Sequence, residues 1–321
     1  MRTIASISLV LVVLIFVGCK PSNSHQQKGS KDLTGTIRLS GAFALYPLVE
    51  LWADEFRKQN PEVKFEISTG GAGRGISDVL SGKVDLGMVS RDLTPDEIAH
   101  GVWFISLAKD AVLPTINASN PILSELKKKG VSKELLKKMF VTGEIKTWEE
   151  LIGRPGKSSI HLFTRSDACG AASIWGAFLG CSQSDLMGDT CLGDPGIIVA
   201  LKGDANSLGY NNVNYVFDNK TRQKFPGIDI LPIDFNGNGI LDGNEDIYRN
   251  LDVFNEAIMK GLYPSPPVRD LYFVSMGKPQ KREVLAFIEW IMDEGQKYVS
   301  LAGYVPLSKS KIGNEKTKIV H

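Results

Sequence analysis

The sequence predicts an α/β fold divided into two lobes. Three successive segments in the first third of the chain each end a strand in small or polar residues: 36–45, 63–75 and 84–91. In an open α/β sheet, ligands collect at such strand ends. The roughly 285 residues that follow the N-terminal region exceed what one core usually covers, so we expect a second lobe.

The N-terminal region has the pattern of an export signal followed by a tether. Residues 1–18 contain Arg2 and an apolar run from 7 to 17 that is short for a membrane span. The ending Gly18-Cys19 resembles the lipobox of bacterial lipoproteins, which implies that Cys19 is acylated after cleavage; Phe16 replaces the usual leucine. An ordinary signal peptide is the alternative. Residues 19–34, rich in Ser, Gln, Lys and Gly, predict a flexible tether.

The charge balance argues against nucleic acid as a partner. The chain has 37 basic and 36 acidic residues, and residues 1–18 contribute only Arg2 to these. An exported chain of balanced charge without a basic tract lacks the phosphate-neutralising surface that DNA and RNA binding requires. Local dipoles and a few arginines must therefore hold any anion.

The first lobe begins with a strand over 36–40, a turn over 41–45 and a helix over 46–59. A second strand runs into the glycine-rich turn 69–75, after which we expect a helix over 76–81. A glycine-rich turn before a helix N-terminus can bind an anion through its backbone N–H groups and the helix dipole. By itself this signal also fits a tight connection.

A second turn of the same kind follows a strand near position 160. The segment 164–170 contains Arg165 and leads into a helix. An arginine fork suits the bidentate recognition of an oxyanion. An ion pair or Asx-turn formed by Arg165 and Asp167 is the purely structural alternative. Between the two turns, the lysine-rich segment 126–140 predicts one solvent-exposed amphipathic helix.

These segments together resemble the phosphate-binding lipoproteins of bacterial ABC uptake systems over nearly the whole mature chain. The resemblance implies a type II Venus-flytrap fold of periplasmic binding proteins, in which two hinge crossings join the lobes. Lobe 1 is then 35–110 and 265–321, and lobe 2 is 111–264. It also implies a periplasmic or cell-surface monomer, anchored by its lipid, that binds phosphate for an ABC permease and is not an enzyme.

The resemblance further implies a set of ligand-binding residues. They are Ala44, Leu45, Gly71, Ala72, Gly73, Ser90, Arg91, Arg165, Cys169, Gly170 and Ala171. This chain departs from the family pattern, because Ala44, Leu45, Ala72, Cys169 and Ala171 stand where hydroxyls are usual. Tungstate, molybdate or sulfate is therefore an alternative ligand. The carboxylate that would accept a proton from phosphate is open among Asp85, Asp92, Asp110 and Asp167.

The cysteines after Cys19 leave two questions open. Cys181 and Cys191 could close a short disulfide loop or stay reduced. Cys169 at a helix start, with His161 as its base, would instead suit a cysteine-dependent hydrolase. His161 lies eight residues earlier on the same predicted strand, so we favour the binding protein.

Residues 234–245 match the twelve-residue calcium loop of EF-hands in full. The oxygen ligands are the side chains of Asp234, Asn236, Asn238, Asp242 and Glu245 and the carbonyl of Ile240, with Gly239 at the bend. Pro232 stands where an entering helix would be, so we expect a structural Ca²⁺ site and not a sensor. An Asn- and Gly-rich surface turn is the alternative.

Overall fold

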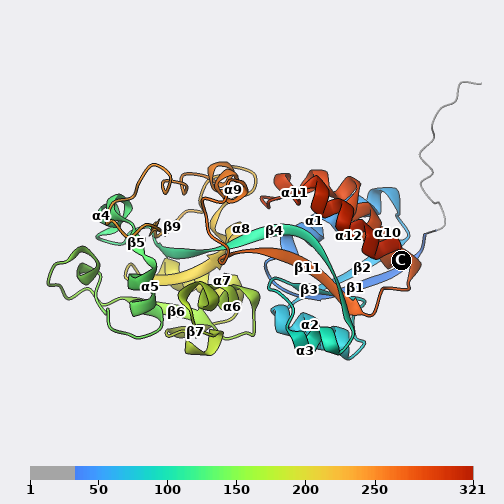
Figure 1. Cartoon of the computed structure of the whole chain (residues 1–321), viewed down its shortest axis with the longest axis horizontal. Helices are drawn as coiled ribbons and strands as arrows, with labels where there is room; N and C mark the ends of the chain where they lie inside the picture. The colour runs from blue at the N-terminus through green and yellow to red at the C-terminus, as the bar shows by residue number, and fades with distance from the viewer. Residues whose placement is uncertain (1–32, 321) are drawn as a thin grey trace, which may run out of the picture.

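The computed structural model describes residues 33–320 and shows two lobes joined by long strands (Figure 1). The predicted signal peptide 1–18, Cys19 and most of the tether 19–34 lie outside the described residues. No helix within 33–320 combines the length and the hydropathy that a membrane span requires.

Within these residues, one nine-stranded sheet passes through both lobes. Its order is β2-β1-β3-β11-β4-β8-β6-β7, with β9 paired to β4. The long strands β4 (Val102–Asn117) and β11 (Val268–Met276) are antiparallel and belong to both lobes. They are the two hinge crossings, and the two-lobed α/β fold predicted from the sequence is confirmed.

Lobe 1 is built from parallel strands covered by helices. Its strands are β1 (Gly35–Gly41), β2 (Val63–Thr69) and β3 (Leu86–Val89), and its helices are α1 (Tyr46–Gln59), α2 (Ala72–Leu80), α3 (Pro95–Ala99), α10 (Arg282–Met292), α11 (Lys297–Leu301) and α12 (Lys309–Val320). The apolar face of α1, which includes Trp52 and Phe56, is buried. The periodic pattern therefore placed this helix correctly.

Helix α2 begins four residues earlier than predicted, directly at the glycine turn. Gly71 has a φ of +86°, which turns the chain from β2 straight into the helix. A Cβ on Gly75 would lie 2.9 Å from the carbonyl oxygen of Met88. The glycines inside α2 thus let the helix pack directly on the sheet backbone.

Lobe 2 contains the remaining elements. Its strands are β5 (Val131–Ser132), β6 (His161–Arg165), β7 (Asp189–Cys191), β8 (Ser207–Asn212), β9 (Ile228–Ile230) and β10 (Ile233–Asp234), and its α-helices are α4 (Leu123–Lys129), α5 (Lys133–Phe140), α6 (Gly170–Leu179), α7 (Gly193–Gly203), α8 (Val213–Val216) and α9 (Leu251–Met259). The single helix predicted over 126–140 is wrong. Gly130, with a φ of +67°, ends α4, and the side chain of Ser132 caps α5.

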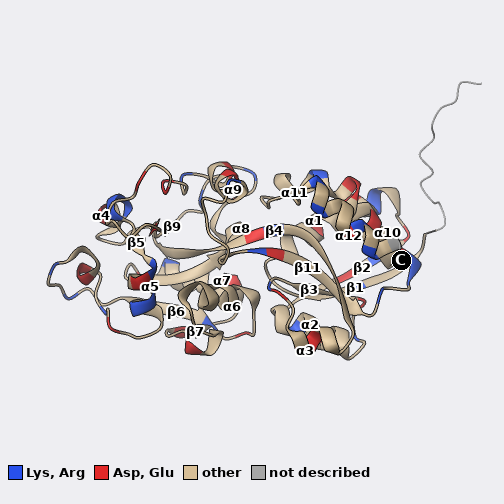
Figure 2. Cartoon of the chain, viewed as in Figure 1, with Lys and Arg blue, Asp and Glu red and all other residues tan. Residues whose placement is uncertain are grey.

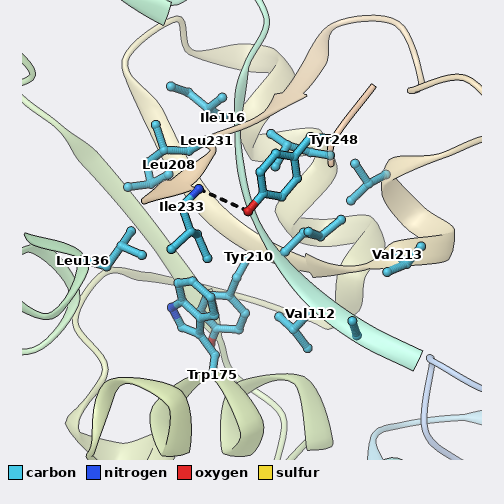
Figure 3. Packing of buried hydrophobic residues seen from close by; sticks show 14 of the residues in the cluster. Val112, Ile116, Leu136, Trp175, Leu208, Tyr210, Val213, Leu231, Ile233 and Tyr248 are labelled. Atoms are coloured by element: carbon cyan, nitrogen blue, oxygen red, sulfur yellow. Dashed lines mark hydrogen bonds between the residues drawn. The ribbon is translucent and has the colours of Figure 1, made fainter. Parts of the chain in front are cut away.

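Each lobe has its own hydrophobic cluster. The cluster of lobe 1 gathers residues between 33 and 108 and between 271 and 319, and that of lobe 2 lies mainly between 111 and 268. In lobe 2 the ring of Trp175 stacks on Tyr210, with 5.8 Å between centroids (Figure 3). The crossing strands between the clusters carry adjacent acidic and basic segments (Figure 2). The hinge is therefore polar where the two cores end.

Candidate functional site

Strand ends from both lobes meet at one interface. Strands β1, β2 and β3 are parallel, so their carboxyl ends lie at one edge of lobe 1. Strands β6 and β8 are parallel in lobe 2 and end at Arg165 and Asn212. The turns predicted to bind a ligand follow these ends, and direct contacts between the lobes bring them together.

The glycine turn of lobe 1 touches the turn after β6. The N–H of Gly73 donates to the carbonyl oxygen of Ala168 at 3.0 Å. A Cβ on Gly71 would lie 2.7 Å from Oδ2 of Asp167. Only glycine therefore allows this approach, and the Asp167 carboxylate lies at the lobe interface.

A second contact joins the end of β3 to the start of α6. A Cβ on Gly170 would overlap the backbone oxygen of Ser90. Gly170 is the first residue of α6, and Cys169 is its N-cap, where Sγ accepts a bond from the N–H of Ala172 at 3.4 Å. The N-termini of α2 and α6 thus meet at the interface, and their dipoles favour an anion there.

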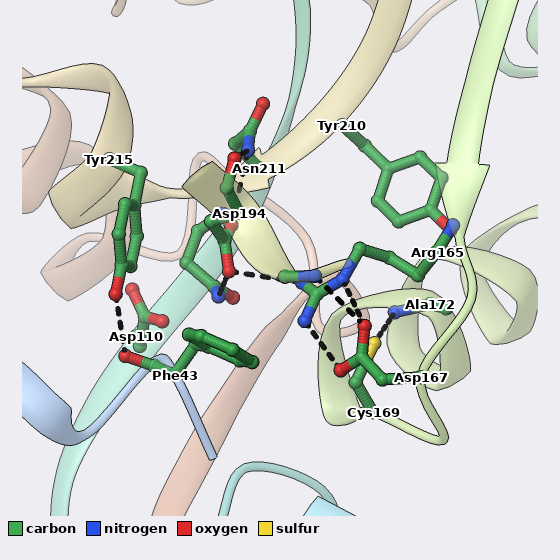
Figure 4. Close-up of polar contacts among 12 residues, drawn as sticks. Phe43, Asp110, Arg165, Asp167, Cys169, Ala172, Asp194, Tyr210, Asn211 and Tyr215 are labelled. Atoms are coloured by element: carbon green, nitrogen blue, oxygen red, sulfur yellow. Dashed lines mark hydrogen bonds and ion pairs between the residues drawn. The ribbon is translucent and has the colours of Figure 1, made fainter. Parts of the chain in front are cut away.

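Arg165 lies at the end of β6 between two carboxylates (Figure 4). Its Nε and Nη2 donate to Asp167 at 2.8 and 2.7 Å, and its Nη1 donates to Asp194 at 3.0 Å. The side chain is only 1% exposed. Burial alone would lower the pKa of Arg165, but the nearby Asp194 and Asp167 carboxylates raise it, so the guanidinium remains charged.

Phe43 of lobe 1 covers this guanidinium. The ring centroid lies 5.4 Å from Cζ of Arg165, within the range of a cation–π interaction. A Cβ on Gly193 would lie 2.7 Å from the same ring. The Phe43 carbonyl accepts a bond from Tyr215 Oη at 3.3 Å (Figure 4). Phe43 therefore packs between both lobes, a role that the sequence analysis missed.

Asp194, in the first turn of α7, is fully buried and accepts four further bonds from lobe 2. Asn212 donates through its backbone N–H at 2.8 Å and its Nδ2 at 2.6 Å, and Nδ2 of Asn211 lies 3.2 Å from both Oδ1 and the carbonyl oxygen of Asp194. Asp194 was not among the residues predicted from the sequence. Its place beside Pro195 at a helix start was the available signal, because acids are favoured in a first turn.

The hinge carries a buried ion pair. Arg269 on β11 lies opposite Asp110 on β4, with 3.2 Å between Nη2 and Oδ2. Burial raises the pKa of Asp110 to about 6 in spite of the guanidinium. Nη2 of Arg269 also donates to Oδ1 of Asn212, whereas Nε and Nη1 have no partner among the described residues.

The other predicted binding residues lie in different surroundings. Ala44, Leu45, Ala72 and Ala171 are buried. The carbonyl oxygen of Ala44 accepts a bond from Tyr304 Oη at 2.6 Å, and Leu45 and Ala72 belong to the hydrophobic cluster of lobe 1. These positions can offer a ligand only backbone groups.

Arg91 and two of the candidate carboxylates are already engaged. The guanidinium of Arg91 forms a bidentate pair with Glu97 at 2.9 and 2.6 Å. Asp92 accepts a bond from Tyr272 Oη at 2.9 Å, and Asp85 pairs with Lys281 at 2.8 Å. Asp110 and Asp167 pair with arginines as well, but Asp167 is the candidate acceptor that lies beside the glycine turn of lobe 1.

The cysteines lack the arrangement of a nucleophilic site. Burial raises the pKa of the Cys169 thiol to about 12, so the thiol stays protonated. His161 hydrogen-bonds through Nδ1 to Asp204, and its side chain is half exposed. Cys181 and Cys191 are free thiols, so the disulfide alternative is not formed. The geometry therefore gives the hydrolase alternative no support.

The loop 234–245 folds around its own side chains. The carboxylate of Asp234 accepts bonds from the N–H groups of Gly237 and Gly239 at 2.6 and 2.8 Å, and Glu245 accepts one from Phe235 at 2.8 Å. Gly239 has a φ of +78° at the predicted bend. Asp234 and Glu245, which occupy the first and last positions, are buried.

Three further side chains of the loop meet at one point. Oδ2 of Asp242 accepts bonds from the amides of Asn236 and Asn238 at 2.8 and 2.9 Å. The amide oxygens of Asn236 and Asn238 accept bonds from the N–H groups of Asn238 and Ile240 at 2.9 and 2.8 Å. Across residues 33–320, no three acidic, histidine or cysteine side chains form a group suited to a metal ion. A cation here would thus rely on amide and carbonyl oxygens as well.

Curated relatives of this chain are binding proteins by name. The phosphate-binding protein PstS of Bacillus subtilis is 31% identical over 203 residues, which cover 63% of this chain and 65% of that protein. The chain thus matches just under two thirds of this relative's length. PstS of Xylella fastidiosa is 25% identical, with 90% of each chain covered.

Solved structures share the fold. A Clostridium perfringens protein, described as a candidate phosphate ABC transporter substrate-binding protein with bound phosphate, superposes with a TM-score of 0.70 at 22% identity, covering 85% of this chain and all of the other. An ABC-type phosphate transport receptor of Vibrio cholerae gives 0.60 at 18% identity, with 84% and 100% covered. The family model of the PBP superfamily domain matches residues 26–294. The chain therefore belongs to the PBP superfamily.

Proposed function

We propose that this protein captures phosphate between its lobes and delivers it to an ABC permease. One observation carries the proposal: the N-termini of α2 and α6 meet beside the charged Arg165, where glycines let the lobes touch. Backbone N–H groups, two helix dipoles and a guanidinium then surround an anion shielded from water. The relatives named for phosphate binding support the same ligand.

The acidic partners of Arg165 favour an anion that carries a proton. Asp167 lies at the interface, beside the glycine turn of lobe 1. Its carboxylate would repel a fully ionised anion but can accept a hydrogen bond from the hydroxyl of protonated phosphate. Sulfate, molybdate and tungstate have no such proton near neutral pH. Cys169 and Ala171 have no side-chain hydroxyl to offer the anion. The discrimination between phosphate and the other anions therefore depends on Asp167.

Titration calorimetry of the purified protein, freed of endogenous ligand, tests this proposal. The panel is phosphate, sulfate, molybdate and tungstate. We expect phosphate to bind at least a hundredfold more tightly than sulfate. If only tungstate or molybdate binds, that anion and not phosphate is the ligand. If none of the four anions binds, the proposed oxyanion site is refuted.

We also propose that the chain is a lipoprotein. The Gly18-Cys19 ending after the apolar run supports acylation of Cys19. The lipid would hold the monomer at the outer face of the membrane that contains the permease, where the permease receives the anion from it. A Cys19→Ser variant should be released from membranes into the soluble fraction. If it fractionates with membranes like the natural chain, the anchor lies elsewhere.

A structural calcium ion in the loop 234–245 completes the proposal. All ligand positions are filled by oxygen-bearing groups, and the side chains of Asn236, Asn238 and Asp242 already converge. Millimolar Ca²⁺ should raise the thermal midpoint by about 5 °C over that in chelator, whereas Mg²⁺ should not. Equal midpoints in Ca²⁺ and in chelator would exclude the site.

A further inference from the structure

One amide side chain joins two buried ion pairs. Asn212, at the end of β8, donates through Nδ2 to Asp194 at 2.6 Å and accepts a bond at Oδ1 from Arg269. Asp194 in turn holds Arg165, and Arg269 holds Asp110. All five side chains are buried, so each bond lies in a medium that strengthens it and makes its loss costly.

This chain of contacts runs from the hinge to the candidate binding site. Arg269 on β11 lies opposite Asp110 on β4. These two strands cross between the lobes (Figure 1). Arg165 lies at the interface where the lobes touch (Figure 4). Asn212 is the residue that contacts both the hinge arginine and the carboxylate beside Arg165. A rotation at the hinge would therefore act on Asp194 through Asn212.

We propose that Asn212 is a positioning residue that couples closure of the hinge to the orientation of Arg165 toward the anion. The proposal rests on the anion-binding function proposed above, and it adds a residue that does not itself touch the ligand. Asn212 fixes Asp194, and Asp194 fixes one end of the guanidinium.

The amide is suited to this place by its chemistry. A carboxylate neighbour needs a donor and a guanidinium neighbour needs an acceptor, and a single amide offers both. Aspartate keeps the acceptor but replaces the donor by a negative charge, and leucine removes both at similar volume. Protonating an introduced aspartate would restore an O–H donor. The charged and titratable groups around this position are Asp194 of α7, Arg269 of β11 and, beyond them, Arg165, Asp110 and Tyr215.

The test compares two substitutions at this one position by phosphate titration between pH 8 and pH 5. At pH 8, both Asn212→Asp and Asn212→Leu should bind phosphate roughly ten- to a hundredfold more weakly than the natural chain. As the pH falls, the ratio of the phosphate Kd of Asn212→Asp to that of the natural chain should approach one, because the protonated carboxyl again donates to Asp194. Asn212→Leu should stay weak throughout. The ionisation of phosphate itself cancels in the ratio.

The outcomes separate positioning from a merely structural role. Unchanged affinity in both variants would overturn the proposal, as would equal losses in both that do not recover at low pH. If Asn212→Leu fails to fold, the recovery of phosphate affinity in Asn212→Asp at low pH still tests the proposal. Circular dichroism at each pH shows which variants are folded.

A ligand-free arm distinguishes this inference from the proposed function. If the natural chain binds none of the anions, the phosphate proposal fails, but the coupling remains measurable by thermal unfolding. Asn212→Leu and Asp110→Asn each remove one of the two acceptors of Arg269 Nη2, so the two variants share this arginine as a partner. Their shifts in midpoint should therefore be non-additive in the double variant. Additive shifts would contradict the coupling.

Discussion

The lobe interface and the loop 234–245 both concentrate charge, but they balance it differently. At the interface, Arg165 pairs with Asp167 from the next turn and with Asp194 from α7, and Phe43 of the other lobe covers it. In the loop, Asp234 and Glu245 accept backbone N–H bonds from their own segment. Removing one charge at the interface therefore leaves buried side chains of other elements without their partners, whereas a change in the loop affects only the loop itself.

Replacing Arg165 should give the largest effect. Arg165→Met leaves Asp167 and Asp194 buried without their cation, which costs about 3–5 kcal/mol of unfolding free energy. We also expect phosphate affinity to fall more than a hundredfold. Chemical denaturation and calorimetry measure the two effects. The control is Arg91→Met, since Arg91 pairs with the single carboxylate of Glu97 and keeps 19% of its side chain exposed. Equal losses of stability and of phosphate affinity in both variants would contradict the special role of Arg165.

A larger side chain at the contact between the lobes tests whether phosphate binding requires the lobes to close, because it changes only the steric fit. A methyl group in Gly170→Ala would overlap the backbone oxygen of Ser90, so phosphate affinity should fall at least tenfold while lobe 2 remains folded. Gly203→Ala is the matched control, because a Cβ there meets no atom within 4 Å. An unaltered affinity in Gly170→Ala would mean that the anion is bound without this contact.

The loop offers the local counterpart. Glu245→Gln replaces the bidentate carboxylate at the last position of the calcium motif by a neutral amide with one oxygen, and we expect it to abolish the rise in thermal midpoint caused by Ca²⁺ without changing phosphate affinity. Asp246→Asn, one residue beyond the motif, should keep the full rise. A loss of phosphate binding in Glu245→Gln would show that the loop and the interface are not independent.

The smallest effect concerns pH and the hinge. The pKa of Asp110 is raised to about 6 by burial, above the ordinary value near 4. The folded chain therefore takes up a proton that the unfolded chain does not, and stability is gained as the pH falls through this window. Relative to Asp110→Asn, the natural chain should gain on the order of 2 kcal/mol between pH 7 and pH 4.5. A difference that does not vary with pH would exclude this titration.

The sequence was sufficient where the information is local. Repeated strand ends predicted the α/β fold, and the apolar period of 46–59 predicted helix α1 with its observed bounds. It was insufficient where partners come from distant segments. Asp194, Asn212 and Arg269 carry no motif, and their roles depend on how β8, α7 and β11 pack. The break of the helix expected over 126–140 followed from a single residue, Gly130, in a left-handed conformation.

The most direct test of the account is a crystal structure of the protein with phosphate. We predict phosphate oxygens within hydrogen-bond distance of the Arg165 guanidinium and of backbone N–H groups at the starts of α2 and α6. Asp167 should lie beside the phosphate hydroxyl. Phosphate bound away from these groups, with Arg165 contacting only Asp167 and Asp194, would contradict the central claim.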